Sequence, residues 1–134
     1  MTTTKTENST RSEVPSNGME KKAYSIDATG KRLGRVATEA ASVLLGKDSV
    51  NFAKNVVEDV VVTIANANKL DISPKRGEME FQTYSGHPGG RKVETLSHLA
   101  KRRGIEEVVR RVVSGMIPKN KLHTPRMKNL VVTE

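Results

Sequence analysis

A continuous run of apolar and β-branched residues, Val60–Ala65 with the sequence VVVTIA, limits the fold of this chain more than any other segment. A strand with one face in water alternates apolar and polar residues, whereas an unbroken run is typical of a strand covered on both faces. Strands of this kind occur where helices pack against a parallel sheet. The run therefore favours an α/β fold.

Two segments have the spacing of helices that bury one face. The first spans about Arg32–Gly46 and ends at a glycine suited to the position after a helix. The second begins after Gly104, and we predict that it stops at Gly115. The residues predicted to face the core are Leu33, Val36, Ala37, Ala40, Ala41 and Leu44 in the first, and Ile105, Val108, Val109, Val112, Val113 and Met116 in the second.

The remaining elements are shorter. We predict strands at Ala23–Ala28 and near Leu130–Val132, and a helix at about Thr95–Arg103. Pro74–Gly77 (PKRG) is predicted to be the tight turn of a hairpin between KLDIS and EMEFQTYS. Strands that alternate with helices support a single α/β domain over residues 22–134. Residues 1–21 are polar and are predicted to be a flexible tail.

The positive charge of the chain is concentrated in one third of its length. The formal net charge is +8. Eleven Lys or Arg and three Glu lie between Gly86 and Lys128, and elsewhere twelve cations balance twelve carboxylates. A solvated surface normally mixes both signs, so this asymmetry indicates a polyanionic partner. The chain has four aromatic rings and no Trp, which favours recognition of phosphate and shape over base stacking.

Nothing in the sequence supports an enzyme, a cofactor site or a metal site. Cysteine is absent, and His87, His98 and His123 are too far apart to show ligand spacing, so we expect them on the surface or facing RNA. GKRLG matches neither common phosphate-loop pattern. No apolar stretch is long enough to span a membrane, and the N-terminus lacks an apolar signal region. We expect a soluble, cytosolic protein with no small-molecule substrate.

Two loops combine glycine or proline with cations. Glycines in YSGHPGGRK, Tyr84–Lys92, would let the backbone lie close to a phosphate, although a plain hairpin exit explains them equally well. In SGMIPKNK, Ser114–Lys121, proline stiffens a backbone that carries Lys119 and Lys121. A stiff display of cations loses less conformational entropy on binding than a flexible tail does.

The segments IDATGKRLGRVATEAASVLLGK, YSGHPGGRK and VSGMIPKNKL follow one another in the order and at the distances found in a known family. On these residues the chain resembles bacterial-type large-subunit ribosomal protein thirteen, the universal L-thirteen family, from about Tyr24 to Val132. The resemblance implies a three-layer α/β/α domain with a short, mainly parallel sheet. It also implies a structural role on 23S-type rRNA, early in assembly of the large subunit.

The resemblance and the charge pattern together predict the RNA-binding residues. These are Lys31, Arg32, Arg35, Lys47, Ser85, Gly86, His87, Gly89, Gly90, Arg91, Lys92, Arg110, Arg111, Gly115, Met116, Pro118, Lys119, Lys121, Arg126 and Lys128.

The expected partners are 23S-type rRNA and neighbouring large-subunit proteins, with the chain present as a monomer in a cytoplasmic or organellar ribosome. Two other classes of function remain open. One is a non-ribosomal RNA-binding regulatory protein, and the other is a nucleotide-using enzyme built on the same α/β core, which the missing phosphate-loop pattern disfavours.

Overall fold

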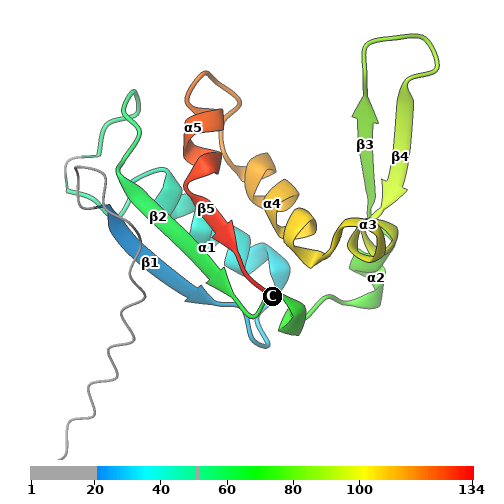
Figure 1. Ribbon diagram of the computed structural model, residues 1–134, viewed down its shortest axis with the longest axis horizontal. Helices are drawn as coiled ribbons and strands as arrows, with labels where there is room; N and C mark the ends of the chain where they lie inside the picture. Colours follow the sequence, from blue (N-terminus) through cyan, green and yellow to red (C-terminus); the bar gives the residue numbers. More distant parts are fainter. Residues whose placement is uncertain (1–20, 51) are drawn as a thin grey trace, which may run out of the picture.

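A computed structural model describes residues 21–50 and 52–134 of the 134-residue chain (Figure 1). The predicted tail, residues 1–21, lies outside the described residues except for Lys21.

The main sheet contains three parallel strands in the order β1 (Lys22–Asp27), β2 (Val60–Ala65) and β5 (Leu130–Val132) (Figure 1). The unbroken apolar run forms the central strand, as its composition predicts. Its register aligns Ile64 with Ile26 on one side and with Val132 on the other. The expected α/β class with a short, mainly parallel sheet is therefore confirmed.

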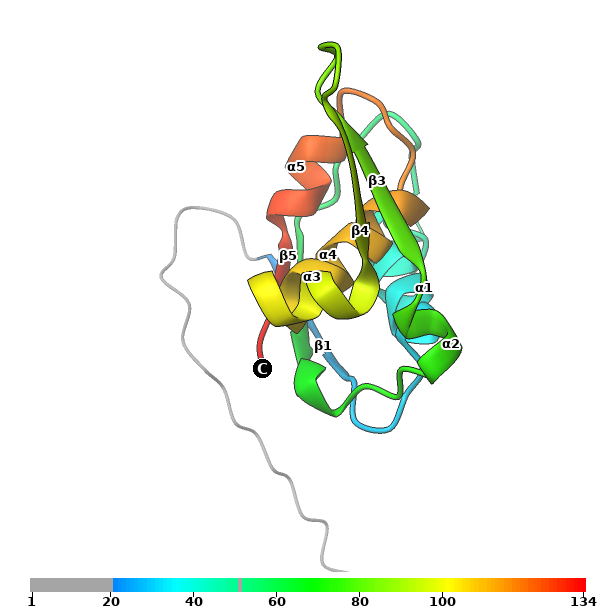
Figure 2. The same cartoon turned by 90° about the vertical axis from the view of Figure 1, so that its right-hand side faces the viewer.

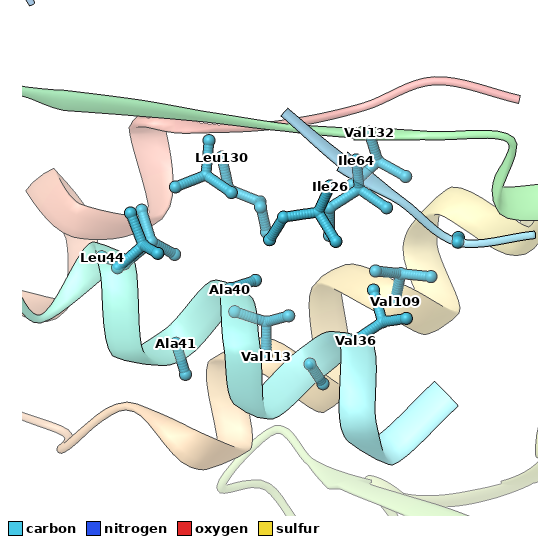
Figure 3. Close-up of a cluster of buried hydrophobic side chains, with 14 of the residues drawn as sticks. Ile26, Val36, Ala40, Ala41, Leu44, Ile64, Val109, Val113, Leu130 and Val132 are labelled. Atoms are coloured by element: carbon cyan, nitrogen blue, oxygen red, sulfur yellow. The ribbon is translucent and has the colours of Figure 1, made fainter. Parts of the chain in front are cut away.

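Helices α1 (Leu33–Leu44) and α4 (Ile105–Met116) pack together against the face of the sheet that carries Ile64 (Figure 3). Half of the buried residues of α1 are alanines (Ala37, Ala40 and Ala41), whose small side chains let a neighbouring helix approach closely. Val109 and Val113 of α4 are completely buried in the same cluster. The two predicted helical faces thus form the core.

The second face of the sheet is less covered in the described part of the chain. Val61 and Thr63 are half-buried, and Val131 is exposed. Of the expected three layers, the described residues form the sheet and the α1–α4 layer.

The predicted hairpin around Pro74–Gly77 is wrong. These residues form a short helix, α2, with Pro74 in its first turn, where the missing N–H of proline has no helical partner to lose. Strand β3 (Glu80–Tyr84) pairs instead with β4 (Arg91–Thr95) in an antiparallel hairpin. The glycine-rich segment, residues 85–90, is the loop of that hairpin.

Helix α3 (Leu96–Arg103) follows β4 directly and packs against α4. The Thr95 side chain caps it by accepting a hydrogen bond from the His98 N–H. Leu96, Leu99 and Val108 form a second, smaller core there. Gly104 separates α3 from α4 with a φ of 86°, as the predicted break requires.

The second long helix does not stop at Gly115, as the sequence suggested, but continues to Met116. The physical cause of its end is Pro118, because the residue before a proline is driven out of the helical region. Ile117 is accordingly extended, with φ −95° and ψ 137°. Part of the predicted basic loop is also helical, as α5 (His123–Lys128).

Candidate nucleic-acid interface

The α4–α5 loop, residues 117–122, displays Lys119 and Lys121 in solvent on a fixed backbone. The Leu122 N–H donates to the Asn120 side-chain oxygen at 3.0 Å, and the His123 N–H donates to the Asn120 carbonyl at 3.0 Å. Ile117 is buried and anchors the start of the loop. Neither lysine forms an ion pair with any described carboxylate. The loop therefore presents two positive charges that only an external anion would neutralise.

His123 and Arg126 hold the far side of this loop. His123 is half-buried, with Nε2 lying 3.1 Å from the Ser114 hydroxyl and 3.2 Å from the Ser114 carbonyl. Arg126 is 2% exposed and donates from Nη2 to the carbonyls of Lys54 and Val56, at 3.3 and 3.1 Å. An arginine enclosed in this way does not reach a phosphate. Arg126 is therefore an anchor of α5, and its burial contradicts the predicted RNA contact.

The hairpin loop combines exposed glycines with cations on the adjoining strand. Gly86 and Gly89 have φ values of 88° and 73°, and a Cβ on either would meet no atom within 4 Å. A Cβ on Gly90, in contrast, would collide with the Ser85 hydroxyl. A side chain at Gly90 would thus have to displace the Ser85 hydroxyl and crowd the His87 carbonyl, whereas Gly86 and Gly89 leave open space for a neighbour. Arg91 and Lys92 belong to β4, not to the loop, and therefore point to opposite faces of the hairpin.

The base of the hairpin is tied to α3 and α4. Arg102 donates to both carboxylate oxygens of Glu94 at 2.8 Å, which lowers the pKa of Glu94 to about 2. Arg111 donates to Glu107 at 3.2 Å, and its guanidinium lies 5.9 Å from the centre of the Phe81 ring. Arg111 is half-buried in these contacts, so the structure gives it a supporting role at the base of the hairpin, and its predicted RNA contact stays a prediction.

The cations at the start of α1 border a groove of about 970 Å³. Arg32 and Arg35 line it at the N-terminal end of α1, Arg76 lines it from α2, and Met116 lines it at the end of α4. Its floor is mainly apolar, and Met116 is 41% exposed there. Lys31 is less available to an external anion, since its Nζ lies 3.6 Å from Oε2 of Glu39. The groove connects the two arginines of α1 to the beginning of the α4–α5 loop.

The structure gathers some of the predicted contacts and separates others. The hairpin loop and the α4–α5 loop lie toward the same end of the molecule, whereas the β1–α1 connection lies toward the other (Figures 1 and 2). Lys47 follows the C-terminal end of α1, so about 18 Å of helix separates it from Arg32. Arg110 and Lys128 are exposed and line one shallow depression beside α5. Gly115, near the end of α4, and Pro118, in the α4–α5 loop, are exposed.

Other kinds of site find no support in the described part of the chain. It contains no group of three or more His, Asp or Glu side chains placed to hold a metal ion. No helix in residues 21–50 or 52–134 is long and apolar enough to cross a membrane.

Sequence reasoning missed the residues that hold the loops in place. No sequence pattern pointed to Ser114, because only the fold of the α4–α5 loop brings His123 to it. Arg126 gave no clear signal either, because the carbonyls that it contacts belong to Lys54 and Val56, about seventy residues away in the chain.

Comparison with known proteins gives a consistent result. The model of the family described as ribosomal protein L13 matches residues 21–134. The large ribosomal subunit protein uL13 of Synechococcus sp. (strain CC9311) is 37% identical over 124 residues, covering 91% of this chain and 82% of the relative. The proteins of the same name from Synechococcus elongatus and Trichormus variabilis are 39% and 38% identical. Both matches cover 81% of this chain, and they cover 73% and 72% of those relatives.

Proposed function

The chain belongs to the ribosomal protein L13 family, structural and non-enzymatic components of the large ribosomal subunit, and from this premise we propose that it binds folded 23S-type rRNA chiefly through phosphate contacts. The observation that carries the proposal is the α4–α5 loop. Its two lysines are unpaired among the described residues, and its backbone is fixed at both ends. Each phosphate that such a cation neutralises releases counterions, which favours binding at low salt.

We propose that the α4–α5 loop and the hairpin act together on RNA. Both lie toward one end of the molecule, with the hairpin projecting to the side of the α4–α5 loop, so RNA folded across that end would touch both (Figures 1 and 2). Arg32 and Arg35 would then meet a second segment beside the groove. Binding at separated points suits a protein that holds parts of a folded RNA together.

A role early in subunit assembly is supported by the state of the protein before binding. The core between α1, α4 and one face of the sheet is already packed in the chain by itself. Rigid binding avoids the entropy of coupled folding, so the chain is able to bind rRNA before neighbouring proteins arrive. We expect it to act as a monomer within the large subunit of cytoplasmic ribosomes, in contact with neighbouring subunit proteins.

Sedimentation of a cell lysate through a sucrose gradient tests this function. We expect the protein to sediment with large ribosomal subunits and to be released by high salt, because the phosphate contacts are screened. A protein that binds RNA but stays in the light fractions would support the alternative, a non-ribosomal regulatory protein.

Gly89→Val tests the close approach of RNA to the hairpin loop. The valine brings a branched side chain into a position that is open in the free protein, and a φ of 73° is strained for it. We expect affinity for large-subunit rRNA to fall about tenfold, a change of about 1.4 kcal/mol, as measured by filter binding.

Gly89→Asn is the matched control, because Asn tolerates positive φ but still carries a Cβ. If close approach matters, Asn also weakens binding. Normal affinity of the Asn variant with weaker binding of the Val variant would show that this position needs a residue that tolerates positive φ, and that RNA does not approach it closely.

A further inference from the structure

One face of the hairpin is covered by no described residue and carries a large aromatic ring. In an antiparallel pair, directly opposed residues share a face, as do residues two apart along a strand. Tyr84 is opposed to Arg91, and Gln82 is opposed to Val93. Tyr84 is 65% exposed and Val93 is 49% exposed. We call this set of four residues the free face of the hairpin.

The other face explains why the free face remains open. Phe81 and Glu94 point from that side toward the helices, where Arg111 and Arg102 contact them. These contacts fix the base of the hairpin and leave its outer half projecting from the body (Figures 1 and 2). The free face is therefore presented on a supported element.

The guanidinium of Arg91 is held in place on the free face. Its Nη2 donates to the Gln82 side-chain oxygen at 3.0 Å. The strand register pairs Arg91 directly with Tyr84. The segment from Tyr84 to Lys92 contains two cations and no carboxylate. An exposed ring and an oriented cation thus occur together in a locally positive region.

We infer that Tyr84 stacks on an unpaired base of the rRNA while Arg91 binds the adjacent phosphate. This inference rests on the proposed function. Every base has a flat π surface, so one exposed ring is enough to hold one base without reading its sequence. The local positive charge matches a nucleotide better than it matches an apolar protein surface.

Tyr84 is also the best placed ring for this purpose. Four rings in the whole sequence are too few for an extended stacking platform, and the structure leaves that expectation valid. Tyr24 packs against the main core and Phe81 lies under Arg111. Phe52 is 41% exposed but lies in the connection between α1 and β2, away from the hairpin. Stacking on this chain is therefore limited to one base, at Tyr84.

The absence of Trp makes the test direct, because the chain has only two tyrosines. In a Tyr24→Phe background the tyrosine emission comes from Tyr84 alone. On titration with large-subunit rRNA purified from the same organism, we expect that emission to fall by half or more, since stacking on a base quenches it. Circular dichroism of the Tyr24→Phe protein, before titration, confirms that the core is intact.

Two substitutions at Tyr84 complete the test. Tyr84→Leu keeps an apolar side chain but removes the ring, and we expect a loss of affinity between about 5- and 150-fold with an unchanged salt dependence. Tyr84→Phe keeps the ring and is expected to bind like the wild type. Arg91→Ala is expected to lower the slope of log K against log salt by about one, because it removes a cation that neutralises a phosphate.

Outcomes that overturn the inference are distinct from failure of the proposed function. If the wild type binds rRNA but the Tyr84 emission is unchanged and Tyr84→Leu binds normally, stacking is wrong and the proposed function stands. If Tyr84→Leu binds rRNA normally but enters subunits poorly, a protein neighbour occupies the free face and the inference is overturned. If the wild type does not bind rRNA at all, the proposed function itself fails.

Discussion

Replacing Arg126 with alanine is expected to lower the free energy of unfolding by about 2–4 kcal/mol. The substitution empties a buried volume and removes both hydrogen bonds to the carbonyls of Lys54 and Val56. These bonds join α5 to the connection before β2, which lies about seventy residues away in the chain. Urea unfolding followed by circular dichroism measures the change.

Two controls separate the causes of this destabilisation. Arg126→Met fills most of the volume without replacing the hydrogen bonds, so it should destabilise the protein less than alanine does. Lys128→Ala, on the same helix but exposed, should change the stability by no more than about 0.5 kcal/mol. If Arg126→Ala changed the stability as little as Lys128→Ala, Arg126 would not be an anchor of α5.

Arg126 should also affect RNA binding without touching RNA. Once α5 is loosened, the α4–α5 loop has more conformations to lose when it binds. We expect the Arg126→Met variant to bind rRNA more weakly while its salt dependence stays that of the wild type, because every phosphate-binding cation is still present.

The double variant Lys119→Ala/Lys121→Ala is expected to weaken binding to an rRNA fragment by about tenfold or more. The slope of log K against log salt should flatten by up to about one unit for each phosphate that is no longer neutralised. Both side chains are exposed and outside any described ion pair, so the fold should keep its stability. Filter binding at several salt concentrations gives both quantities.

A variant with the same change in net charge is the proper comparison. Lys69→Ala/Lys75→Ala removes two exposed lysines from η1 (Ala67–Lys69) and α2, away from the α4–α5 loop. We expect only a small, long-range effect from it. Equally weakened binding in both double variants, or an unchanged slope in the first, would argue against direct phosphate contact at the loop.

The core could be predicted from the sequence because it depends on local periodicity. The buried faces of α1 and α4 and the central strand each repeat apolar residues at the spacing of their own secondary structure. That pattern requires no knowledge of partners. The residues predicted for the two helical faces are accordingly buried or half-buried, except Met116, which lines the groove.

The pairing of β3 could not be predicted in the same way. The alternating pattern near Phe81 predicts a strand but does not indicate which segment pairs with it. The sequence of Pro74–Gly77 suits the first turn of a helix as well as a tight turn. The true partner, β4, lies beyond a six-residue loop that the sequence marked only as glycine-rich. The sequence pattern therefore predicted a partner before β3 in the chain, whereas the true partner follows it.

The candidate interface shows a related limit. Charge counts identified the basic third of the chain, but a count does not separate a cation in solvent from one that supports the fold. Arg111 and Arg126 are engaged with Phe81, Glu107 and two backbone carbonyls. Lys119 and Lys121 remain exposed. That distinction depends on interactions between distant segments, which only the three-dimensional structure contains.

A cryo-electron microscopy structure of the large ribosomal subunit that contains this chain tests the central claim most directly. We expect the ammonium groups of Lys119 and Lys121 and the guanidinium of Arg91 to lie about 3 Å from phosphate oxygens of folded rRNA. The claim would be contradicted if these three groups faced bulk solvent while the rRNA lay against the sheet face that carries Val131.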